Sequence, residues 1–197
     1  MEHCSGGEVP IGKGDKLSVK QCLITEFEIQ QMKDKPYASL VGSVIYAQVC
    51  SKPDLAFALS VLGRFQSNTG LPHWNAVKKV LRYLKRTQTY VLTYHYVDDL
   101  ELTCYTDANL GGCVDDRMPT SGYIFMLAGG SVSWRSKKQQ TRAVSTMESE
   151  YVGCFEAMRQ ANWLKNLIHH MKYDSDFGEP IQTLISSFQG PSAALNW

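Results

Sequence analysis

The spacing of apolar residues along the chain predicts helices first and strands later. Residues 1–35 are rich in glycine, lysine and aspartate and show little periodicity, which predicts a loosely ordered lead-in. Two apolar runs from Tyr37, interrupted by Ser51–Pro53, predict two short helices that contribute to a core. A third predicted helix follows Pro72, and its apolar stripe consists of Trp74, Val77, Leu81 and Leu84. The pattern thus predicts a small helical region over residues 36–97.

Beyond residue 97 the period changes to two, which is typical of β-strands. The stretch "LELTCYTDA" places Leu102 and Thr106 on one face and Asp107 on the other, so a strand is expected to end near Asp107. The next strand, Tyr123–Leu127, is expected to turn at Gly129–Gly130 into a partner strand. These two segments form a predicted hairpin.

A long amphipathic helix, Thr146–Lys172, follows the hairpin, and "PIQTLISSF" after it predicts a last strand. A helix that joins three local strands to a fourth is a crossover connection. Residues 98–197 are therefore expected to form an α/β domain with a mixed sheet.

Composition narrows the class of protein without identifying it. The 197 residues are 44% hydrophobic, and 20 Lys and Arg balance 19 Asp and Glu, so the totals favour neither nucleic acid nor membrane as a partner. The six cysteines form no CxxC pair, which favours reduced thiols. The first 20 residues lack the features of a secretory signal, and no run approaches the about 20 apolar residues of a membrane span. We expect a soluble, intracellular protein, cytoplasmic or nuclear.

Positive charge is concentrated in the helical region, where no acidic residue occurs between Asp54 and Asp98. Aromatic residues are interleaved with these cations, as in surfaces that bind a phosphate backbone. A solvated polar face explains the same pattern equally well. The candidate nucleic-acid-binding residues are Arg64, Lys78, Lys79, Arg82, Lys85 and Arg86.

Two glutamates stand at the start of the long helix. Glu148 lies three residues after Ser145, the spacing of a capping box in which the carboxylate returns to the Ser145 N–H. Glu150 has no such local partner and lies beside the apolar stripe, where a carboxylate is costly unless something binds it. Together with Asp107 it would supply two oxygen ligands for Mg²⁺. An ordinary solvent-facing glutamate is the alternative for Glu150.

The segment "YTDANLGGCVDDRMPTSGYIFMLAGGSVSWRSKKQQTRAVSTMESEYVGCFEA" closely resembles the ribonuclease H of copia-type retrotransposon Pol polyproteins. Upstream, "PYASLVGSVIYAQVCSKPDLAFALSVLGRFQSNTGLPHWNAVKKVLRYLKRT" resembles the region that connects polymerase and ribonuclease H in these polyproteins. The resemblance implies a ribonuclease H-like fold that cuts the RNA strand of an RNA·DNA hybrid. It implies two Mg²⁺ ions held by four carboxylates, of which Asp107 and Glu150 match the first two.

The chain departs from this family where the remaining acids belong. The family's third acid lies in an apolar-Cys-Asp-Asn strand, and the corresponding place here holds Ser186–Phe188. The fourth acid belongs to a stretch beyond Trp197. Because the loss of a ligand, or even of its outer-shell support, commonly lowers metal affinity or activity by about 10- to 100-fold or more, we expect weak or absent Mg²⁺ binding and impaired hydrolysis. The domain is accordingly expected to be a truncated ribonuclease H.

Other interpretations follow from the same residues. A polymerase-like "YVDDL" begins at Tyr96, but it falls in the connecting region, and Asp98 and Asp99 are expected to be turn residues. Asp115 and Asp116 are likewise expected in a turn. A truncated sheet would expose an edge strand that a protein partner covers. The alternative function is a non-catalytic module that binds nucleic acid or another protein.

Overall fold

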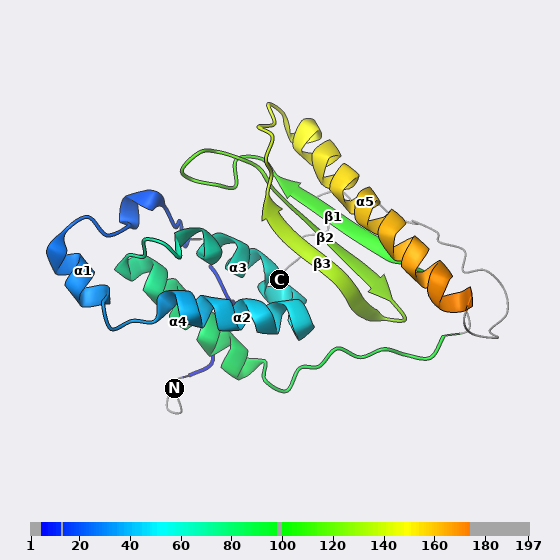
Figure 1. Cartoon of the computed structure of the whole chain (residues 1–197), viewed down its shortest axis with the longest axis horizontal. Helices are drawn as coiled ribbons and strands as arrows, with labels where there is room; N and C mark the ends of the chain where they lie inside the picture. The colour runs from blue at the N-terminus through cyan, green and yellow to red at the C-terminus, as the bar shows by residue number, and fades with distance from the viewer. Residues whose placement is uncertain (1–4, 13, 98–99, 174–197) are drawn as a thin grey trace. The chain divides into compact units, whose positions relative to one another are not determined.

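The computed structural model describes residues 5–12, 14–97 and 100–173, and these divide into two compact units (Figure 1). The first unit extends to Val91 and includes the loop Val114–Asp116. Among the described residues, the second comprises Leu92–Cys113 and the chain from Arg117 to Tyr173. The boundary thus falls at Val91, whereas the sequence predicted it at residue 97.

The lead-in has more structure than its composition predicts. It contains the 3₁₀ helix η1 (Val19–Gln21) and the helix α1 (Glu26–Met32). Thr25 begins α1 through a capping box, because its Oγ1 accepts the Glu28 N–H while the Glu28 carboxylate accepts the Thr25 N–H at 3.0 Å. Leu17 is buried in the core of the unit. These contacts hold a segment that we expected to be loosely ordered.

The predicted helices of the first unit are present. Their bounds are α2 (Tyr37–Ser51), η2 (Pro53–Leu55), α3 (Ala56–Leu62), η3 (Gly63–Phe65) and α4 (Leu71–Arg86). Pro53 opens η2, a position at which its missing N–H costs no helical hydrogen bond. The most deeply buried apolar side chains of this core are Val41, Leu55, Leu62, Val77 and Val80.

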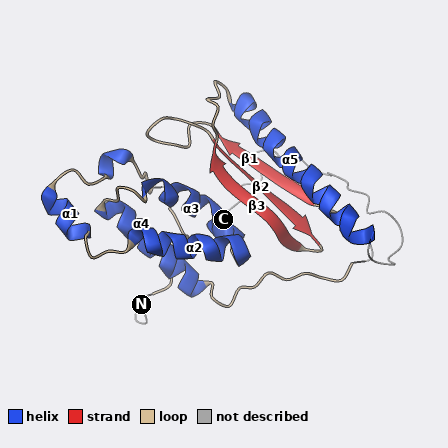
Figure 2. Cartoon of the chain, in the orientation of Figure 1, coloured by secondary structure: helices blue, strands red, loops and turns tan. Residues whose placement is uncertain are grey.

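The second unit is built on a three-stranded antiparallel sheet in the order β1-β2-β3 (Figure 2). Its strands are β1 (Thr103–Asn109), β2 (Thr120–Leu127) and β3 (Gly130–Lys138). The hairpin turn is Ala128–Gly129, one residue earlier than predicted. Both of its residues have positive φ, 51° and 78°, as a two-residue hairpin turn of this hand requires.

Helix α5 (Thr146–Tyr173) packs along β1 and β2 on one face of the sheet (Figure 1). Small residues on the helix allow this close approach. The shared core comprises Leu102, Cys104, Phe125, Ala157, Ala161 and Leu164. An α/β arrangement with a long helix after the hairpin is confirmed.

The segment after Val91 belongs to the second unit because it is bonded to the hairpin turn. The His95 N–H donates to Ala128 O at 2.8 Å, and the Tyr94 hydroxyl donates to Ser131 O at 2.8 Å. A Cβ on Gly130 would lie 2.5 Å from the Tyr94 ring. Gly130 is therefore required by the close approach of Tyr94, and it lies in β3 rather than in the turn.

Two predictions fall outside the described residues. They are the last strand, within residues 180–188, and the turn at Asp98 and Asp99. The mixed sheet depends on that last strand, so the ribonuclease H-like fold stays a prediction.

Candidate functional site

Asp107 lies near the end of β1, opposite Gly122 of β2. Leu102, Cys104 and Thr106 are buried, whereas Asp107 is exposed. Because successive side chains of a strand point to opposite faces, Asp107 belongs to the face that does not carry α5. The predicted alternation of this strand is confirmed.

Glu148 has the structural role that its spacing from Ser145 predicts. Ser145 Oγ accepts the Glu148 N–H at 3.1 Å. The returning bond differs from the prediction, because the Glu148 carboxylate accepts the Val144 N–H, at 2.8 Å, and not that of Ser145. The carboxylate thus reaches one residue beyond the N-cap.

Glu150 is half-buried one turn before Cys154 on α5. Burial raises the pKa of the Cys154 thiol, and the nearby Glu150 carboxylate raises it further. The intermediate burial of Glu150 is that of a residue at the margin of the core, as the helical spacing predicted. Cys154 is a free thiol, as are Cys22, Cys50, Cys104 and Cys113.

Gly153 sets the contact between α5 and β1. A Cβ at this position would lie 3.4 Å from the Ser121 Cβ and 3.6 Å from both the Ala108 Cβ and the Thr106 Oγ1. Thr106 and Ala108 flank Asp107, and Gly153 is three residues from Glu150. The packing therefore brings together the segments that carry the two predicted ligands, although Asp107 lies on the far face of its strand.

Carboxylate oxygens suit Mg²⁺, but a complete ion cage needs more donors than this pair supplies. Within the described ranges, no three His, Cys, Asp or Glu side chains converge in a way that could hold a metal ion. The described residues therefore do not fit a two-ion centre.

Buried polar contacts that the sequence does not reveal also hold the start of α5. Gln139, 2% exposed, directs its side-chain amide onto Ser149 O at 2.8 Å, and its backbone N–H donates to Pro119 O. Ser149, between the two glutamates, is fully buried. Nothing in the local sequence marks Gln139, because its partners come from other elements.

The candidate nucleic-acid-binding residues have different surroundings. Lys78 is exposed on α4, whereas Arg64, on η3, directs its Nε to Ser60 O at 3.2 Å. Lys79 pairs with Asp15 at 2.5 Å, and Arg86 with Glu8 at 3.6 Å. The remaining candidates, Arg82 and Lys85, are half-buried on α4.

This positive surface is thus less unbalanced than the sequence predicts, because the lead-in brings Asp15 and Glu8 to α4. The sequence between Asp54 and Asp98 contains no acidic residue, but in the fold carboxylates from outside this segment lie beside its cations. Neither carboxylate was recognised from the sequence, since each partner is far along the chain.

Asp115, which we expected to be a turn residue, has a further role within the first unit. Its carboxylate accepts the Ser18 hydroxyl at 2.5 Å and the Val19 N–H at 3.0 Å. These bonds satisfy groups at the start of η1, where backbone N–H groups lack helical partners. A capping contact of this kind favours a structural role for Asp115.

Comparison with known proteins shows clear relatives. Over 171 residues the chain is 40% identical to the retrovirus-related Pol polyprotein from transposon TNT 1-94 of Nicotiana tabacum, a match that covers 87% of this chain and 13% of the polyprotein. It is 50% identical over 133 residues to the secreted RxLR effector protein 161 of Plasmopara viticola, covering 68% of this chain and 94% of that protein. The Pol polyprotein from transposon RE2 of Arabidopsis thaliana is 35% identical over 132 residues, or 67% of this chain and 9% of the relative.

Other comparisons give no match. No protein-family model and no solved structure matches the chain. Among the residues that the structure describes, no helix is both long enough and apolar enough to cross a membrane.

Proposed function

Because the chain belongs to the family of retrovirus-related Pol polyproteins of transposons, we propose that its second unit is a ribonuclease H-like domain with impaired hybrid cleavage. The proposal concerns a segment, since the chain spans 13% of the tobacco polyprotein. Its substrate class is the RNA·DNA hybrid, of which the RNA strand would be cut.

The packing of α5 against β1 is the observation that carries the proposal. Gly153 lies over Thr106 and Ala108, so the segments that bear Glu150 and Asp107 are adjacent. A carboxylate at the end of a strand and another in the first turns of a crossing helix are the first two ligands that we expect for Mg²⁺.

The impairment that we propose rests on the place of the third carboxylate, which Ser186–Phe188 occupy in this sequence. Loss even of an outer-shell partner of a metal ligand commonly costs about 10- to 100-fold in affinity or activity. The Asp107 side chain also belongs to the face of β1 that points away from α5, the helix that carries Glu150, and this weakens binding of one ion by both carboxylates. We therefore expect little metal-dependent cleavage.

Cleavage of a labelled RNA·DNA hybrid in Mg²⁺ or Mn²⁺ tests the proposal. We expect a rate at least ~100-fold below that of an intact ribonuclease H. Glu150→Gln should abolish whatever chelator-sensitive cleavage remains, whereas the matched control Glu148→Gln, on the same helix, should retain it. Rapid chelator-sensitive cleavage that Asp107→Asn abolishes would overturn the impairment. Residual cleavage that is insensitive to both Asp107→Asn and Glu150→Gln would overturn the assigned site.

A second candidate function is binding of nucleic acid through α4. Lys78, Arg82 and Lys85 follow the spacing i, i+4, i+7, so they share one stripe of the helix. Each cation that contacts a phosphate contributes about 0.9 to the slope of log K against log salt. Filter binding of a hybrid should therefore show a slope that falls by about one in Lys78→Gln. Lys33→Gln, an exposed cation just after α1, is the control. A salt-independent affinity would remove this candidate.

A further inference from the structure

Four residues of the lead-in, Gly6, Gly7, Glu8 and Asp15, contact α4 at the levels of Lys79, Arg82 and Arg86. The Gly7 N–H donates to Arg82 O at 3.1 Å. A Cβ on Gly6 would lie 2.9 Å from the Arg86 Cβ, so the backbone of the lead-in runs directly against the helix. Together with the ion pairs of Asp15 and Glu8, these contacts bring two carboxylates to cations of α4.

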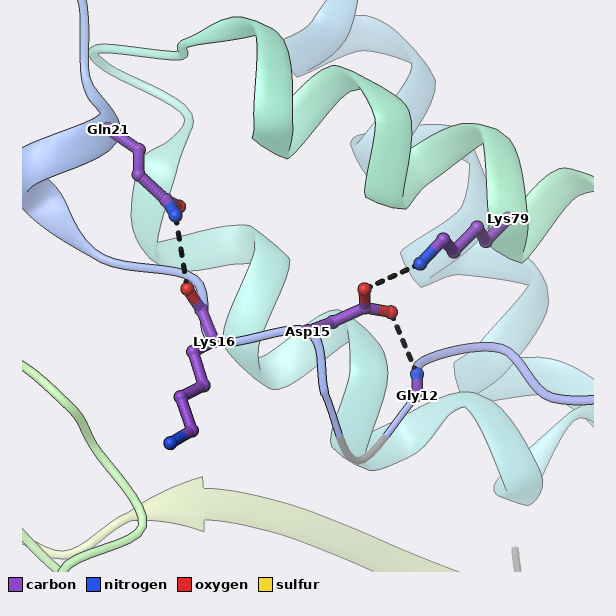
Figure 3. A network of polar contacts seen from close by, with 5 residues as sticks. All are labelled: Gly12, Asp15, Lys16, Gln21 and Lys79. Atoms are coloured by element: carbon purple, nitrogen blue, oxygen red, sulfur yellow. Dashed lines mark hydrogen bonds and ion pairs between the residues drawn. The ribbon is translucent and has the colours of Figure 1, made fainter.

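Asp15 is held in position independently of its ion pair. Figure 3 shows its carboxylate between two donors: Oδ1 faces Lys79 Nζ, and Oδ2 accepts the Gly12 N–H at 2.9 Å. The Gln21 side chain donates to Lys16 O at 3.2 Å and thereby fixes the next residue of the lead-in. The Asp15 N–H also donates to Gly12 O at 2.9 Å, so two bonds to Gly12 fix the position from which the carboxylate meets α4.

Charge is retained on this carboxylate at neutral pH. Burial raises the pKa of Asp15, but the hydrogen bonds from Lys79 and Gly12 and the charge of Lys79 outweigh burial, so the pKa lies below its usual range. An ionised carboxylate on an ammonium group has the charge and hydrogen-bonding pattern of a bound phosphate oxygen.

The two paired cations share one stripe of α4. Lys79 and Arg86 are seven residues apart, hence nearly in line at 100° per residue. Lys78 and Arg82 are four residues apart on the neighbouring stripe. The lead-in thus places acidic groups along one of the two cationic stripes of the helix.

We infer that the lead-in is a built-in competitor, whose Asp15 and Glu8 occupy on Lys79 and Arg86 the positions that phosphates of a nucleic acid would take. The inference rests on the second candidate function, binding through α4. Exposed ion pairs contribute little to stability, because water and salt screen them. Here the Lys79 side chain is 42% exposed and that of Glu8 is 86% exposed, so a polyanion can displace these contacts. Nucleic acid and lead-in would then alternate on the same stripe.

Fluorescence anisotropy of a labelled RNA·DNA hybrid, titrated against the full chain from 50 to 200 mM salt, tests this inference. Asp15→Asn removes the charge and keeps an oxygen that can accept the Gly12 N–H, whereas Glu8→Gln changes an exposed side chain that has little influence on folding. Each should raise the affinity at low salt and steepen the salt slope by about one, which is a ~4-fold larger loss of affinity across this range. Glu26→Gln is the matched control, because it removes the same charge from exposed α1.

The outcomes separate the two proposals. If the native chain binds and all three variants bind with the same slope, the competitor is overturned while nucleic-acid binding stands. If Glu26→Gln steepens the slope as much as Asp15→Asn, net charge explains the effect and the competitor is again overturned. If neither the native chain nor any variant binds, the candidate function fails and the inference fails with it. Hydrogen exchange of the Gly12 amide should accelerate on addition of hybrid, a readout that a merely structural ion pair would not give.

Discussion

Helices α4 and α5 carry the candidate functional residues of their units, yet they are fixed in different ways. The side chains that cap the start of α5, Ser145 and Glu148, are neighbours in the sequence, although Gln139 also donates to Ser149 O there. The ends of α4 also depend on distant segments, in addition to the local bond between Gly70 and His73: Gln21 lies against Gly70 at the start, and Lys52 donates to the carbonyls that follow the last turn. A cap formed by neighbouring residues can be identified from their spacing in the sequence, whereas a contact between distant segments depends on the fold.

Among the substitutions that test this difference between α4 and α5, we expect Gly70→Ala to have the largest effect on stability. A Cβ on Gly70 would lie 1.7 Å from Gln21 O, a backbone atom that cannot move alone. The segment around η1 must therefore shift, and we expect a loss of ~3 kcal/mol in the free energy of unfolding, measured by urea denaturation.

Gly42→Ala is the control for this change. Gly42 lies inside α2, where an added Cβ meets nothing within 4 Å. Alanine has the higher helix propensity, so this variant should be more stable by ~0.5–1 kcal/mol. Equal destabilisation by the two substitutions would show that the Gln21 contact is not what requires Gly70.

Protonation of His73 should weaken the start of α4. This side chain is fully buried, it stacks on Phe65 with ring centroids 4.0 Å apart, and its Nδ1 accepts the Gly70 N–H at 3.1 Å. Burial lowers the pKa of His73 and outweighs nearby polar groups, including the Asp115 carboxylate.

The native state therefore binds the proton less readily than the unfolded chain. The stability that neutral His73 contributes is fully present above the ordinary pKa of histidine, about 6.5. It is lost as the pH falls toward the lower pKa of the folded state, and the free energy of unfolding then falls by at most ~1.4 kcal/mol per pH unit. Urea denaturation between pH 5 and 8 measures this slope. His73→Gln, which retains an acceptor, should flatten it, and an unchanged slope would assign the effect to other groups.

A smaller effect is expected at the other end of α4. Lys52 Nζ donates to Thr87 O at 2.7 Å and to Tyr90 O at 3.1 Å. Lys52→Met keeps the aliphatic stem and removes the donor, so we expect a loss of about 1–2 kcal/mol. Lys33→Met, just beyond the short helix α1, should change stability little. Amide exchange in the last turn of α4 would locate the effect, and protection equal to that of the native chain would contradict it.

The same contrast explains how much of the candidate site could be predicted. The alternation around Asp107, the capping bond of Ser145 and the position of Glu150 beside Cys154 all follow from periods of two and 3.6 residues. The partners Asp15 and Gln139 could not be predicted, since their contacts depend on which elements pack together.

The fold shows the same limit. Hydrophobic spacing predicted the helices around Tyr37 and Trp74 and the hairpin, because each is a local pattern. The turn was predicted one residue too late, because the two glycines serve different purposes. Gly129 adopts a positive φ in the turn, whereas Gly130 lies in β3, where Tyr94 approaches closely. The structure of the lead-in could not be predicted because Leu17 belongs to no periodic apolar pattern. Its burial depends on packing against residues that are distant in the sequence.

We expect the smallest effect on stability at the N-terminal cap of α5, which Ser145 and Glu148 form. Ser145→Ala removes the acceptor of the Glu148 N–H and should lower stability by about 1 kcal/mol. Ser145→Asp keeps an acceptor and adds negative charge at a helix N-terminus, so it should match or exceed native stability. Thermal unfolding measures both variants. Because the partner lies three residues away, the loss should appear as faster amide exchange in the first turn of α5 and leave β1 unchanged. An equal acceleration in β1 would mean that this cap, like the ends of α4, depends on distant contacts.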